Sequence, residues 1–229
     1  MNQDDFVAGV LYRSALNDEQ VWRKDPKNCH DVKLFDEMIA KIRKLGYNYK
    51  YYPDISMRRH EDPELIDIIA DYLGKFTKEG ITAELVRSIG TKSGQVATVR
   101  ILDSFFNLTD QSKRKHAAFY DEALRSIGDR RYIDEYLKMI RYPECARRLD
   151  LLMNMLGKWK DERTKQICLE YLYSTDYALL HSATTTLGFY KNDLEVIDGL
   201  KACRERNADS PPEVKLIDRA LKRAEPKKK

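Results

Sequence analysis

One spacing in this sequence limits what the chain can fold into: short amphipathic segments recur in pairs, with a period close to 30 residues. Glycine follows many of these pairs. Gly46 and Gly74 lie 28 residues apart, Gly128 and Gly157 lie 29 apart, and Gly157 and Gly188 lie 31 apart. A period of this length that holds two helices is typical of helical solenoids, in which each unit buries its apolar face against the next. The sequence therefore predicts an all-α protein, a right-handed α-solenoid of antiparallel helix pairs.

Individual helices can be placed from the residues that start and stop them. The clearest runs over Glu61–Gly74, where Asp62 is a candidate N-cap and a proline occupies the first helical position. Another is predicted over Tyr142–Gly157, opened by Pro143 and closed by Gly157 in a left-handed cap. Apolar residues recur at spacings of three and four in both segments, so each helix has one face to bury.

The ends of the chain differ from the repeats. Residues 1–30 are expected to form an N-terminal capping helix over Asp4–Asn17, followed over Asp18–Asn28 by a polar run that is either a connection or a ragged helix. Residues 31–224 are predicted to form the repeat domain, and residues 225–229 a disordered basic tail.

Two internal segments need separate interpretations. The tyrosine-rich stretch Tyr47–Pro53 is predicted to be an ordered loop, because no second strand-like run is available to pair with it. Its rings either pack on neighbouring helices or form a contact surface. The stretch Val96–Phe106 is the most apolar of the chain, and we expect it at the centre of the protein.

This pattern resembles the HEAT-repeat and armadillo-like family, whose second helix often begins near Asp-Pro and ends in Ala-Leu-Gly. The matching residues are Asp62-Pro63 with Ala70 and Leu73-Gly74, Pro143 with Arg147-Arg148 and Leu156-Gly157, and Ala183 with Leu187-Gly188. The resemblance covers roughly residues 31–224 and departs most between Lys75 and Lys115. It implies a solenoid fold and says little about function, because one fold serves many functions.

Composition restricts the compartment and the class of partner. The 229-residue chain has 41 basic and 37 acidic residues, a formal charge of +4, and its last three residues are lysines, so the body is almost neutral. Nucleic-acid binders usually carry a stronger or more localised positive field. The four cysteines do not have the spacing of metal ligands or of a redox motif, and we therefore expect the protein in a reducing cytoplasm. The sequence contains no run of about 18 apolar residues, so we expect no membrane span.

Catalytic and metal-binding motifs are not recognisable, and we expect no cofactor and no metal. The four histidines are isolated, and His60-Glu61 does not continue into His-Glu-x-x-His. The segment Ser88–Gly94 has the residue types of a phosphate loop without its spacing or its preceding strand. His181 lies on an expected helix, near the face that solenoids turn inward, and we include it in a candidate partner-binding surface.

Basic residues supply the rest of that surface. They form three clusters near expected helix starts in consecutive repeats: Lys113, Arg114 and Lys115; Arg130 and Arg131; Arg147 and Arg148. Repeats stacked at a fixed offset would align them along one edge, which could contact an acidic protein or phosphates. The alternative is a solvated rim balanced by neighbouring acidic residues. Arg58 and Arg59 either extend this edge or flank a helix cap.

The leading hypothesis is a non-catalytic protein-binding module that holds a protein or peptide on its concave face, as an adaptor, an inhibitor or an immunity-type protein. The alternative is a nucleic-acid-binding or DNA-repair protein that resembles HEAT-like DNA glycosylases. That resemblance implies Trp and Asp side chains that line a basic cleft. The two tryptophans, Trp22 and Trp159, lie far apart in the sequence, and neither can be given a companion Asp. The oligomeric state is left open.

Overall fold

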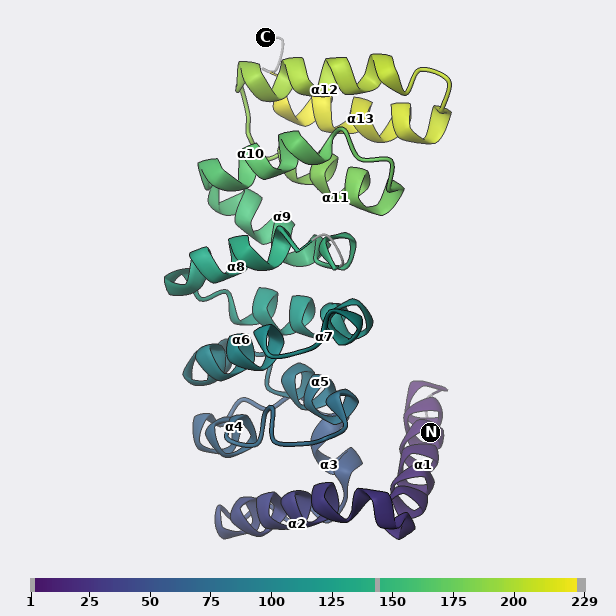
Figure 1. Cartoon of the computed structure of the whole chain (residues 1–229), viewed down its shortest axis with the longest axis vertical. Helices are drawn as coiled ribbons and strands as arrows, with labels where there is room; N and C mark the ends of the chain where they lie inside the picture. Colours follow the sequence, from purple (N-terminus) through teal and green to yellow (C-terminus); the bar gives the residue numbers. More distant parts are fainter. Residues whose placement is uncertain (1–2, 143–144, 226–229) are drawn as a thin grey trace. The chain divides into compact units, whose positions relative to one another are not determined.

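The computed structural model describes residues 3–142 and 145–225, with side chains from residue 11 onward. Among these residues every regular element is helical, and no strand occurs (Figure 1). The prediction of an all-α protein is confirmed. The chain divides into two compact units, Met1–Asp129 and Arg130–Lys229, which are described in turn as unit 1 and unit 2.

Unit 1 is built from helices that pack on their neighbours in sequence and on the next pair. Its elements are α1 (Gln3–Lys24), η1 (Pro26–Asn28), α2 (Cys29–Lys44), α3 (Tyr52–Ser56), α4 (Pro63–Ala70), α5 (Glu79–Ser88), η2 (Lys92–Ala97), α6 (Thr98–Phe106) and α7 (Asp110–Ile127). Helix α5 packs between α3 and α7, and α4 packs between α2 and η2. Helix α1 contacts α3. In Figure 1, α3 and α5 lie between α1 and α4.

Unit 2 repeats one packing arrangement. Its elements are η3 (Arg130–Tyr132), α8 (Ile133–Ile140), η4 (Ala146–Arg148), α9 (Asp150–Trp159), α10 (Glu162–Tyr171), α11 (Tyr177–Leu187), α12 (Leu194–Arg206) and α13 (Pro211–Ala224). Helix α8 packs on α9, α10 on α11 and α12 on α13. The second helices of these pairs also pack on one another in series, α9 on α11 and α11 on α13.

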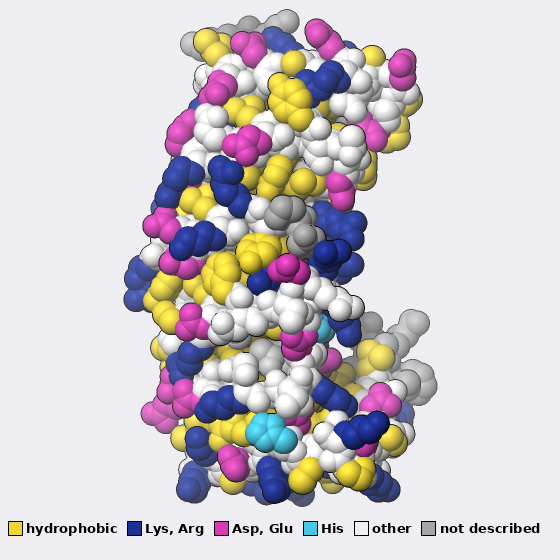
Figure 2. Space-filling view, viewed as in Figure 1, with side chains coloured by type: hydrophobic (Ala, Val, Ile, Leu, Met, Phe, Trp, Pro, Cys, Tyr) yellow, Lys and Arg dark blue, Asp and Glu magenta, His cyan; other side chains and the backbone are white. Residues whose placement is uncertain are grey.

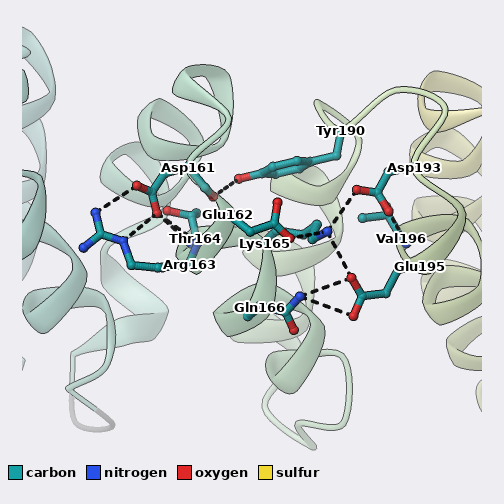
Figure 3. A network of polar contacts seen from close by, with 10 residues as sticks. All are labelled: Asp161, Glu162, Arg163, Thr164, Lys165, Gln166, Tyr190, Asp193, Glu195 and Val196. Carbon is teal, nitrogen blue, oxygen red and sulfur yellow. Dashed lines mark hydrogen bonds and ion pairs between the residues drawn. The ribbon is translucent and has the colours of Figure 1, made fainter.

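Hydrogen bonds between successive helix pairs span about one period of the sequence. The Tyr190 hydroxyl donates to the backbone carbonyl of Asp161 at 2.7 Å, 29 residues earlier (Figure 3). In unit 1 the Thr91 hydroxyl donates to the carbonyl of His60 at 2.8 Å, 31 residues earlier. In both cases the acceptor is a carbonyl at or just before the start of a helix, so these bonds join each pair to the next.

A cluster of charges joins α10 to α12 in unit 2. The Lys165 ammonium is almost buried, and it lies 3.1 Å from Asp193 and 3.0 Å from Glu195, with Glu162 also in contact (Figure 3). The Gln166 side-chain amide donates to both carboxylate oxygens of Glu195. Asp193 is also the N-cap of α12, so the same carboxylate starts one helix and binds the cation of another.

The predicted boundary of the first helix is wrong. Helix α1 continues to Lys24 through most of the polar run, for which a connection and a ragged helix were the two interpretations. Tertiary contacts explain the extension: the buried Glu19 carboxylate accepts the Tyr52 amide at 2.7 Å and pairs with Arg23 at 2.7 Å. These contacts of Glu19 stabilise the helical conformation of a polar segment that by composition would favour a loop.

The helix predicted from Pro143 begins later. Helix α9 starts at Asp150, after the 3-10 turn of η4, while Pro143 itself lies outside the described residues. Gly157 does not end this helix, which continues to Trp159 and leaves Lys160 in the left-handed conformation (φ 57°).

The reason for a glycine at position 157 is packing. A Cβ atom there would lie 2.5 Å from Cγ2 of Thr186 on α11. Gly157 thus permits a close approach between the second helices of adjacent pairs rather than a change in backbone direction.

Other predicted elements agree in part. Asp62 caps α4 by accepting the Glu64 amide at 2.9 Å, as predicted, although that helix ends at Ala70. The expectation for Val96–Phe106 holds only for its second half, because the Val96 and Val99 side chains are 49% and 48% exposed. Residues 226–229, the greater part of the expected tail, lie outside the described residues.

Stability should depend on pH through His60, which joins three segments of unit 1. Its ring is buried, with Nε2 3.0 Å from the Ile55 carbonyl, and its amide donates to the Ser88 carbonyl at 3.0 Å. Burial lowers the pKa of His60 below its ordinary value, and the Arg58 charge adds to this while the Ile55 contact opposes it. The unfolded chain therefore binds more protons at His60 than the folded chain does once the pH falls below about 6.5. The free energy of unfolding should decrease as the pH is lowered through this range.

The corresponding test replaces His60 with glutamine. Urea unfolding between about pH 7.5 and 5 should show a clear loss of stability in the wild type and a smaller loss in His60→Gln. Parallel pH profiles for the two proteins would contradict the assignment.

Candidate functional site

The predicted basic cluster of unit 1 lies on the first two turns of α7. Lys113 is buried, with its ammonium 3.9 Å from the Asp110 carboxylate, so it is not part of an accessible edge. Arg114 and Lys115 are exposed. Two of these three predicted residues are therefore at the surface.

The remaining predicted residues lie in unit 2. The Arg130 guanidinium lies over the Trp159 ring, 5.0 Å from its centroid, and Arg131 lies over Tyr132 at 5.7 Å. These contacts are typical cation–π pairs on a protein surface. They hold the guanidinium planes against rings of the same unit.

Arg147, Arg148 and His181 come close to one another because η4 contacts α11. All three are exposed. The Arg147 guanidinium lies 3.6 Å from the Asp176 carboxylate at the start of α11. The His181 ring lies 6.2 Å from that of Tyr177, one turn earlier on the same helix. Charged side chains of both signs are interspersed over the face drawn in Figure 2, so charge alone does not single out a site.

A cavity in unit 1 has the character of a binding site. It has a volume of about 540 Å³ and lies between α1, α3 and α5. Its apolar wall includes Leu11, Met57 and Ile81. Its aromatic and charged residues are Trp22 and Tyr52, the carboxylates Asp18, Glu19 and Glu84, and the cations Lys78 and Arg87. Mostly apolar cavities of this size with a few convergent polar groups are typical of ligand sites.

Trp22 forms one side of this cavity. The side chain is half-buried, and its indole Nε1 has no hydrogen-bond partner among the described residues. The Lys78 ammonium lies 5.8 Å from the centroid of the ring. A large aromatic surface on a long helix can contribute much contact area at a small entropy cost.

Tyr52 forms another side. Its hydroxyl lies 3.3 Å from the Ile81 carbonyl, to which it donates. Burial, and then the nearby Glu84 carboxylate, raise the pKa of Tyr52 well above its ordinary value. The hydroxyl therefore stays protonated at neutral pH, where it is a hydrogen-bond donor and a poor base.

Arginines line a second depression of about 270 Å³ beside the first cavity. Arg58, Arg59 and Arg87 line it, together with Ser56 and Ser88. Ser56, Met57 and Arg87 line both hollows, so the two are continuous.

A third hollow of about 480 Å³ continues along α5 towards α7. It shares Tyr52 and Glu84 with the first cavity and is also lined by Lys115 and His116. Burial lowers the pKa of His116, and the Lys115 charge adds to this effect. Of the three predicted basic clusters, only Lys115 borders these hollows, whereas Arg58 and Arg59, which we considered as an extension of the basic edge, line the second one.

Most of this site has no recognisable signal in the sequence. Trp22 lies in the run interpreted as a connection or a ragged helix, where it was the only large side chain. Tyr52 lies in the tyrosine-rich stretch, for which a contact surface was one of two interpretations. Glu84 and Arg87 occupy polar positions on an amphipathic helix, and periodicity does not distinguish such positions from ordinary solvated ones.

Comparison with protein-family models, curated proteins and solved structures finds no match to this chain. Within residues 3–142 and 145–225, no three His, Cys, Asp or Glu side chains are grouped so that they could hold a metal ion. None of the described helices is both long and apolar enough to cross a membrane.

Proposed function

We propose that this protein is a non-catalytic binding module that holds a segment of another protein in the cavity between α1, α3 and α5. The observation that carries this proposal is the cavity of about 540 Å³ that Trp22 and Tyr52 line together with the apolar side chains of Leu11, Met57 and Ile81. Aromatic anchors beside apolar pockets are the usual centres of protein-binding surfaces. Adaptor, inhibitor and immunity-type roles all fit such a module.

We further propose that each unit is a short stack of HEAT-like helix pairs. Support comes from the serial packing of α9, α11 and α13 and from hydrogen bonds that recur about 30 residues apart in both units. A stack of this kind spreads side chains over an extended face, which suits recognition of an extended segment.

The polar groups of the cavity favour binding over acid–base chemistry. Tyr52 stays protonated at neutral pH, and Glu19 is occupied by Arg23 and by the Tyr52 amide. Glu84 lies beside the Tyr52 hydroxyl, where its charge adds to the raised pKa. These groups fix the wall of the cavity and leave its aromatic faces as the main contact area.

The test is retention of the purified protein by a bead-bound pool of short peptides of random sequence. Trp22→Ala should weaken retention by about thirtyfold, the effect typical of a central aromatic anchor. Trp159→Ala is the matched control, since Trp159 packs beside Tyr136 and Arg130 in unit 2. Equal retention of the Trp22→Ala variant and the wild type, with both folded in urea titrations, would overturn the proposal.

A second candidate function is nucleic-acid binding of the HEAT-like glycosylase type. One observation favours it: Trp22 now shares a cavity with Asp18, a companion carboxylate that the sequence alone could not assign. Binding to generic duplex DNA that falls steeply with salt concentration would support this candidate. Absence of binding at low salt would remove it.

A further inference from the structure

Three guanidinium groups and one carboxylate line the depression beside the main cavity. Arg59 pairs with Glu122, the one carboxylate that lines the depression. Arg58 and Arg87 form no ion pair among the described residues. Two guanidinium charges therefore remain at one end of the binding cavity.

Both of these guanidinium groups are held in place by aromatic rings. Arg58 lies over the Tyr49 ring at 5.7 Å, and Arg87 lies over the Phe119 ring at 5.6 Å. Arg87 also donates to the Ser56 carbonyl at 3.3 Å. A guanidinium whose position is restricted by a ring contact loses less side-chain entropy when it binds a ligand.

We infer that this depression binds the phosphate of a phosphorylated side chain on the protein segment that the main cavity holds. A phosphate monoester carries a charge of about −1.5 to −2 at neutral pH, which matches two guanidinium groups that have no ion-pair partner in the described part of the chain better than a single carboxylate does. Ser56, Met57 and Arg87 line both hollows, so a residue next to the phosphorylated one can reach Trp22 and Tyr52. The inference rests on the proposed function and adds the chemistry of its partner.

The test compares two bead-bound peptide pools that differ only in a central serine, which is phosphorylated in one and unmodified in the other. The wild-type protein should be retained by the phosphorylated pool at least tenfold better. Arg58→Gln and Arg87→Gln should each lower that preference by about tenfold. Arg125→Gln, an exposed arginine of α7 outside all three hollows, is the matched control and should leave the preference unchanged.

Arg58→Gln is the more direct variant. Arg58 is exposed and its ring contact with Tyr49 is at the surface, so we expect the protein to fold without the guanidinium group. Urea titration checks that both variants are folded. Equal retention by the two pools, with loss in Trp22→Ala, would overturn the phosphate inference and leave the proposed function standing. Retention by neither pool would overturn both. Arginine-dependent binding of single-stranded DNA without peptide binding would assign the depression to nucleic acid instead.

Discussion

Replacing Gly90 with alanine should destabilise unit 1 by about 3 kcal/mol, the upper end of the usual range for overpacking a tight contact. Gly90 follows α5, and a Cβ atom there would lie 2.5 Å from the Cα and 2.7 Å from the Cβ of Ala123 on α7. A backbone atom cannot rotate away as a side-chain tip can, so α5 and α7 would have to separate. These two helices also carry Arg87 and Phe119, so a shift should disturb the binding surface as well.

The measurement is urea unfolding followed by tryptophan fluorescence in a Trp159→Phe background, where Trp22 in unit 1 is the only tryptophan. Gly80→Ala, in the first turn of α5, is the matched control. A Cβ at Gly80 would meet only Cε1 of His116, at 3.8 Å, so alanine should be neutral or stabilise the helix by about 0.5 to 1 kcal/mol. If Gly90→Ala unfolds at the wild-type urea concentration, the close packing of α5 on α7 is not as described.

Replacing Lys165 with methionine should destabilise unit 2 by about 2 kcal/mol. Methionine keeps most of the buried stem but removes the charge that faces Glu162, Asp193 and Glu195. Loss of one partner from a buried ion pair costs about 3 to 5 kcal/mol. We expect less here, because the Glu162 and Glu195 side chains are more than half exposed and water can replace part of the interaction.

The pH dependence of this effect identifies its cause. The Lys165 ammonium and then the Gln166 amide lower the pKa of Glu195. Burial of Asp193 opposes its ionisation, but Lys165 and the Val196 amide outweigh this, so its pKa is also lowered. A lowered carboxylate pKa stabilises the fold above the unfolded value of about 4, and this contribution is lost as pH falls through the folded value.

The difference between the wild type and Lys165→Met should therefore be largest near neutral pH and shrink below about pH 4. Arg163→Met is the control, since Arg163 is 54% exposed and water screens its pairs with Asp134 and Asp161, so its loss should change stability far less. A destabilisation of Lys165→Met that does not change with pH would indicate lost packing rather than lost charge.

Much of the helical framework could be predicted from local signals. Asp62 and Asp176 start their helices as N-caps, and Gly128 ends α7 in the left-handed conformation. These residues act on backbone groups only a few positions away, so the sequence around them contains the whole interaction. The period near 30 is likewise local, because it is the length of two short helices and their turns.

The candidate site could not be predicted in this way. Trp22, Tyr52 and Arg87 lie on three different elements, and they line one cavity because α1, α3 and α5 pack together. Nothing near Trp22 in the sequence indicates that Tyr52 lies opposite it. Lys113 gives the converse case: it belongs to a basic run, yet its side chain is buried.

The sequence by itself determined that this chain is helical, where most of its helices lie, and the length of its repeat. Hydrogen-bonding caps and the spacing of apolar residues act within one or two turns, so they can be recognised without coordinates. Only the tertiary structure decided why Gly157 and Gly90 are glycines, where α1 ends, and which side chains share a cavity. Those outcomes depend on contacts between residues about 30 or more positions apart, whose geometry exists only after the helices have packed.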